Sequence, residues 1–119
     1  MIKGTDCLKT VIYIDYDIPF DFKEEREMVF EKIVDSLHSA LSYHDYGYKM
    51  TPNYTSNNTI TIFKLKGDSD SWRKDIKSIL DQMHTIEIYD RENDSVEEYE
   101  NTNYIIEFNY TEIFNITEY

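Results

Sequence analysis

The segment of residues 10–16, TVIYIDY, constrains the fold more than any other part of the chain. It combines β-branched and aromatic residues, and apolar side chains occupy both odd and even positions. A strand with that pattern lies inside a sheet, with a neighbouring strand on each side. Asp17 and Pro19 end it, because proline cannot donate to a strand ladder. The sequence therefore predicts a sheet built around this segment.

Two segments have the periodicity of helices. Asp21, with Glu24 three residues later, has the pattern of a capping box ahead of apolar residues at helical spacing, which predicts a helix over residues 22–43. Ser69 or Asp70 is expected to cap a second helix. The apolar face of that second helix consists of Trp72, Ile76, Ile79, Leu80 and Met83.

Short apolar runs predict four further strands, at residues 46–51, 59–66, 84–90 and about 103–114. The fold class expected is α+β, a ferredoxin-like βαββαβ arrangement with an additional C-terminal strand. The sheet would be antiparallel, with both helices on one face and the first and third strands in its centre. The fifth strand is expected to pair with the fourth through an acidic turn. At 119 residues the chain fits a single domain, residues 1–119.

Negative charge is concentrated in the last third of the chain. The net charge is −12, and residues 1–80 contribute only −2 of it, from 13 acids and 11 bases. Residues 81–119 hold 11 acids and a single base, Arg91, for a net of −10. Direct nucleic-acid binding is disfavoured, because its affinity depends on cations that meet phosphates. The charge instead favours a basic protein partner.

Asp15 and Asp17 are candidate metal ligands at the end of the first strand. Residues two apart on a strand point to the same side, so both carboxylates could hold magnesium or manganese. The alternative is that both are solvated at the strand end and that Asp17 helps to form the turn before the helix. The solvated strand end is favoured over the metal site, since a pair of aspartates is a weak pattern in a chain with 24 acids.

A family resemblance involves the same residues. The run YIDYDIPFDFKEERE, a strand ending in Tyr16, Asp17 and Ile18 ahead of a charged helix, resembles the opening of the small CRISPR-associated adaptor nucleases of ferredoxin-like fold. YGYKM after the helix and TIEIYD at the fourth strand are similar to the same family, over residues 10–90 at most. The resemblance implies a magnesium-dependent nuclease in which Asp17 binds metal within a dimer.

Other catalytic patterns are absent from the sequence. His38, His44 and His84 have no metal-binding spacing, and the three glycines stand apart, so no phosphate-binding loop is predicted. The expectation is a protein without a cofactor, and a binding protein more than an enzyme. The single cysteine, Cys7, is typical of a reducing compartment. No apolar run approaches roughly 18 residues, so no membrane contact is expected. The expected location is the cytoplasm, which would be that of the host cell if a phage encodes the protein.

The acids of the last third are the leading candidate for a binding surface. Alternate carboxylates on a strand repeat every ~6.6–6.8 Å, so an acidic hairpin can imitate a phosphate backbone. The chain also has 11 tyrosines, a residue type enriched in interfaces. The expected partner-binding residues are Glu87, Asp90, Glu92, Asp94, Glu97, Glu98, Tyr99, Glu100, Glu107 and Glu112.

This surface predicts a small acidic interaction protein that occludes the basic channel of a nucleic-acid-binding enzyme or effector. Phage or viral inhibitors of host defence, such as anti-CRISPR proteins, are of this kind. An immunity protein or antitoxin that covers a basic toxin is an alternative. A homodimer joined through sheet edges is a further one, and a purely solubilising role for the acids is the plainest alternative.

Overall fold

The computed structural model describes residues 5–19, 21–90 and 92–113. Its main sheet has four antiparallel strands in the order β2-β3-β1-β6. The strands are β1 (Thr5–Asp15), β2 (Gly47–Pro52), β3 (Thr59–Lys66) and β6 (Asn103–Ile113). The α+β class and the central position of the first and third strands are therefore confirmed.

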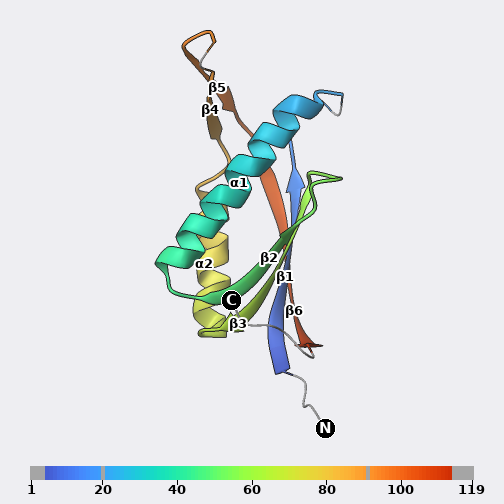
Figure 1. Ribbon diagram of the computed structural model, residues 1–119, viewed down its shortest axis with the longest axis vertical. Coiled ribbons are helices and arrows are strands. Elements are labelled where there is room, and N and C mark those ends of the chain that lie inside the picture. Colours follow the sequence, from blue (N-terminus) through green and yellow to red (C-terminus); the bar gives the residue numbers. More distant parts are fainter. Residues whose placement is uncertain (1–4, 20, 91, 114–119) are drawn as a thin grey trace.

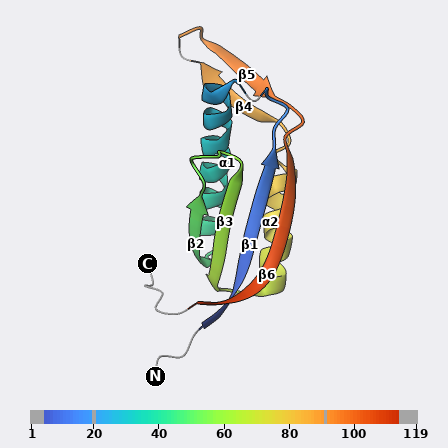
Figure 2. The same cartoon turned by 90° about the vertical axis from the view of Figure 1, so that its right-hand side faces the viewer.

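Two helices, α1 (Lys23–Tyr43) and α2 (Ser69–Asp81), cover the same face of this sheet (Figure 2). The predicted helix over residues 22–43 is confirmed, but its predicted cap is wrong. The N-cap residue is Phe22, and among the described residues no side chain caps α1. The expected cap of the second helix, Ser69 or Asp70, is also wrong: α2 begins at Ser69, and its N-cap is Asp68, whose side chain accepts the backbone N–H of Ser71.

Between α2 and β6 the chain forms a separate two-stranded sheet. It pairs β4 (Ile86–Asp90) with β5 (Ser95–Tyr99). The predicted pairing of the last strand with the fourth is therefore wrong, since β6 pairs with β1 along its whole length. The strand order is accordingly not strictly that of the ferredoxin-like βαββαβ fold. Strand β5 escaped prediction because almost all its side chains are exposed, which removes the alternation that marks a half-buried strand.

The core lies between the main sheet and the helices. Leu8, Thr10, Ile12 and Ile14 of β1 are buried on the helix side. The intervening side chains face the uncovered side of the sheet, where Tyr13 is 41% exposed. Strand β1 is thus central in the sheet, but only one of its two faces is covered.

The molecule is elongated, with extents of 58 × 26 × 24 Å. The β4–β5 hairpin lies at the same end as the first turns of α1 (Figure 1). Strand β6 starts near that end and runs down the length of the sheet. The hairpin is therefore an extension of the domain at one end and adds no strand to the main sheet.

Candidate interaction surface

Two glutamates face each other across the β4–β5 hairpin. Glu87 is directly opposite Glu98, and the neighbouring cross-strand pair on the same face is Tyr89 with Val96. All four side chains are exposed. Like charges in directly opposite positions destabilise a strand pair. Within the described residues neither glutamate has a hydrogen-bond or salt-bridge partner, so the repulsion between them is not compensated there.

The opposite face of the hairpin attaches it to the domain. Ile86 is buried, and Ile88 and Tyr99 pack against the core. The hydroxyl of Tyr99 donates to Oε2 of Glu97 at 2.8 Å. Burial, followed by this hydrogen bond, raises the pKa of Tyr99 to about 12. Tyr99, one of the predicted binding residues, is therefore chiefly an anchor, and Glu97 is held beside it.

The tip of the hairpin is closed by a second tyrosine. The hydroxyl of Tyr89 donates to Oδ1 of Asp94, and this bond is the main reason that the pKa of Tyr89 is raised. Asp94 has a positive φ of 46°, a left-handed conformation that aspartate tolerates in turns. Glu92 and Asn93 are exposed beside it. Asp94 therefore shapes the turn as well as adding charge to it.

The predicted acids do not form one continuous row. Glu87 and Glu98 occupy one hairpin face, Glu97 occupies the other, and Glu100 follows β5 as an exposed residue. Glu107 lies in β6 opposite Val11, on the uncovered face of the main sheet. The side chains of Asp90 and Glu112 are outside the described part of the structure. The expected array of carboxylates is thus divided between two sheets.

Asp15 and Asp17 each lie beside an asparagine. Asp15 is the last residue of β1 and pairs with Asn103, and Asn101 donates to Oδ2 of Asp17 at 3.3 Å. These residues line a shallow pocket with Tyr16. No group of three or more histidine, cysteine, aspartate or glutamate side chains suited to a metal ion occurs within residues 5–19, 21–90 and 92–113. The contacts of Asp17 fit a role in fastening the β1–α1 turn to the start of β6.

A groove that the sequence did not predict lies between α1 and the hairpin. Two adjoining cavities, of about 500 and 270 Å³, share Lys32, Glu87 and Tyr89 in their walls. We call this the α1–hairpin groove. Its α1 wall comprises Met28, Glu31, Lys32, Asp35 and Ser36. In the sequence these residues lie on the polar side of a helix, and only the position of β4 makes them part of a groove.

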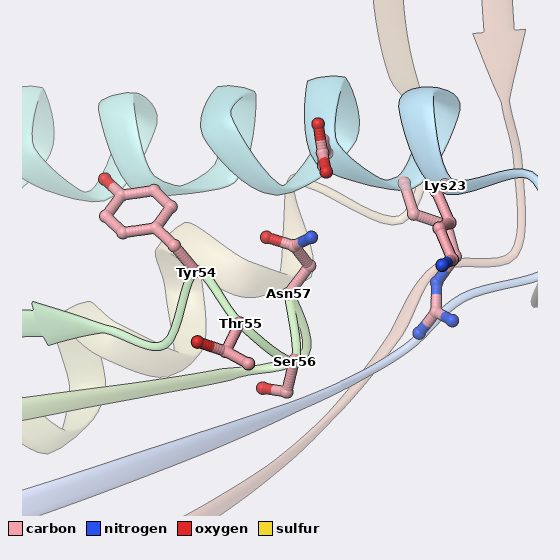
Figure 3. Close-up of a pocket in the computed structure, with 7 residues that line it drawn as sticks. Lys23, Tyr54, Thr55, Ser56 and Asn57 are labelled. Atoms are coloured by element: carbon pink, nitrogen blue, oxygen red, sulfur yellow. The ribbon is translucent and has the colours of Figure 1, made fainter.

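Another pocket, of about 250 Å³, lies between the first turns of α1 and the β2–β3 loop (Figure 3). Tyr54 and Asn57 extend toward α1, whereas Thr55 and Ser56 point away from it. Tyr54 packs edge-on against Phe30 with ring centroids 5.6 Å apart. The polar groups of this loop do not converge on one point, so the pocket is the weaker candidate.

Comparison with known proteins finds no matching family model, no matching curated protein and no matching solved structure. Within the described residues, neither helix is both long and apolar enough to span a membrane.

Proposed function

We propose that this protein is a small acidic interaction protein that binds a basic, nucleic-acid-binding partner and blocks the surface where that partner holds phosphates. The observation that carries the proposal is the Glu87–Glu98 pair, an exposed like-charge pair kept directly opposite across two strands. Such a pair costs stability in the free protein. A cationic partner would remove the repulsion between the two carboxylates on binding, so the pair would favour the bound state.

The distribution of charge supports the same proposal. Residues 81–119 carry a net charge of −10, and the hairpin that holds many of these acids extends from one end of the domain. A concentrated negative field accelerates association with a basic surface and repels nucleic acid. In this proposal the protein acts as a competitor of nucleic acid, and its carboxylates take the place of phosphates.

Capture followed by competition tests the proposal. The immobilised protein would be incubated with nuclease-treated extract of the cells in which it is made, and the retained protein identified and purified. Binding of that partner to labelled nucleic acid should fall as the acidic protein is added. The inhibition should weaken as salt rises, because contacts between exposed charges are screened.

Charge variants provide the control. The pair Glu87→Gln and Glu98→Gln should weaken inhibition, whereas Asp45→Asn with Asp70→Asn removes the same amount of charge from exposed positions outside the hairpin and should not. A partner that stays bound without losing its nucleic acid would contradict the competitor role. Equal inhibition by both double variants would show that the hairpin is not part of the interface.

A further inference from the structure

The α1–hairpin groove has apolar side chains exposed along its walls. Met28 is 43% exposed, and Tyr89 and Val96 are each 56% exposed. Ile88 lines the groove as a half-buried residue, and Met83 and Ile86 are buried at its base. Single exposed apolar residues are ordinary, but a group of them gathered in one concave surface is typical of a binding site.

Acids predominate on the rim of the same groove. Glu31 and Asp35 project from α1, four residues apart and therefore on one helix face, and Glu87 faces them from β4. Against these three acids, the described residues of the walls include one base, Lys32. Glu98, opposite Glu87, adds a further carboxylate to the hairpin side. The groove thus combines an apolar interior with a net negative rim.

We propose that the α1–hairpin groove is the docking site for a basic segment that carries apolar side chains, supplied by the protein partner. This inference rests on the proposed function and specifies which part of the partner is held. Its apolar side chains would contact Met28, Tyr89 and Val96, while its lysines or arginines would reach the carboxylates of the rim. Charge complementarity selects this occupant over a second copy of the chain, because two copies of net charge −12 repel each other.

The length of the groove agrees with a short segment. From Met28 to Ser36 the α1 wall covers eight residue steps, or about 12 Å at ~1.5 Å per residue. That length accommodates about two turns of helix or four extended residues of a partner. Short segments of this size bind through a few anchoring side chains, which makes the site accessible to peptide probes.

Three labelled peptides of equal length test the inference with the intact protein. The first consists of lysine and leucine, the second replaces every leucine by serine, and the third replaces every lysine by glutamate. Fluorescence anisotropy should show that the first binds, that the second binds at least about tenfold more weakly, and that the third does not bind. Equal affinities for the first two would overturn the groove inference and leave the proposed function standing. Failure of both lysine peptides to bind would contradict both.

Matched variants locate the binding site. Tyr89→Ala and Val96→Ala should each weaken binding of the lysine–leucine peptide, by about tenfold for the tyrosine. Tyr110→Ala and Ile105→Ala remove apolar side chains from β6 that are at least as exposed as Tyr89 and Val96, and they should leave binding unchanged. Tyr89→Phe loses the bond to Asp94 but keeps the ring, so it separates hairpin closure from apolar contact. If the β6 variants weaken binding as much as the hairpin variants, the peptide does not occupy the groove.

Discussion

The indole N–H of Trp72 in α2 donates a hydrogen bond of 2.8 Å to the hydroxyl oxygen of Thr10 in β1, across 62 residues of sequence. Both side chains are completely buried. Tryptophan carries a polar N–H into the core, and threonine supplies the acceptor on β1, between the buried side chains of Leu8 and Ile12. This bond fixes the position of α2 on the sheet.

Thr10→Val should therefore destabilise the protein by about 1–3 kcal/mol, because it leaves a buried indole N–H without an acceptor. Urea unfolding followed by the fluorescence of Trp72, the single tryptophan, measures the change. Thr61→Val is the matched control, since Thr61 lies in β3 opposite Val11 on the uncovered face of the sheet. If both variants lose the same stability, the Trp72–Thr10 bond has no special contribution.

Removing the like-charge pair of the hairpin should stabilise the protein. Glu87→Gln or Glu98→Gln should each raise the free energy of unfolding, by about 0.2–1 kcal/mol. The double variant should gain little beyond the better single variant, because either change already removes the repulsion. Thermal unfolding of the four proteins gives the coupling energy. Glu107→Gln, an exposed acid opposite Val11, should change stability much less, and an equal gain there would indicate a general charge effect.

Gly67 occupies a position that other residues cannot take without strain. Its φ is +119°, and an added Cβ would lie 2.5 Å from Cδ1 of Tyr46. Gly67→Ala should cost about 1–3 kcal/mol, the range for a sparsely populated backbone conformation. It should also disturb the bond from Tyr46 to Asp75. Denaturant unfolding and the near-ultraviolet circular dichroism of the tyrosines check this, and Ser78→Ala in exposed α2 surface should be close to neutral.

Alkaline conditions should unfold the protein through its tyrosines. Burial raises the pKa of Tyr16 and Tyr104, and burial with a hydrogen bond to a carboxylate raises the pKa of Tyr46 and Tyr99 to about 12. The unfolded chain ionises near pH ~10 while the folded chain resists. The stability is therefore fully present below pH ~10 and is lost as the pH rises toward about 12.

Unfolding experiments in urea at several alkaline pH values, with tyrosinate absorbance as a second signal, measure that loss. Tyr104→Phe removes one of the residues with a raised pKa, so its stability should fall less steeply above pH ~10 than that of the parent protein. Tyr43→Phe changes the most exposed of the described tyrosines and is the control. A fall that is equally steep in the parent and in Tyr104→Phe would show that Tyr104 titrates normally.

Much of the fold could be predicted because its signals are local. Strand β3 spans residues 59–66 as predicted, and Trp72, Ile76 and Leu80 form the buried face of α2. The partner of β6 could not be predicted, because strand pairing depends on contacts between segments far apart in sequence. Once β5 pairs with β4, β6 is left free to complete the open edge of β1.

The candidate surface was predicted only in part for the same reason. Glu87, Glu97 and Glu98 lie on the hairpin, because they are close together in a sequence that turns back on itself. Glu107 is close in sequence but belongs to another sheet. The sequence carries no signal for the α1–hairpin groove, because Met28 and Lys32 become part of its wall only when β4 packs beside α1.

The pairing of β1 with β6 also sets the order in which the domain can be completed during synthesis. Thr5 pairs with Ile113, so a ribosome must deliver almost the whole described chain before the sheet closes. Until then β1 exposes one edge of 11 residues that is ready to pair with any other strand. A nascent chain stopped after the hairpin would already carry the acidic surface, yet its central strand would still be open to aggregation. The negative charge of that hairpin would then keep such unfinished chains apart.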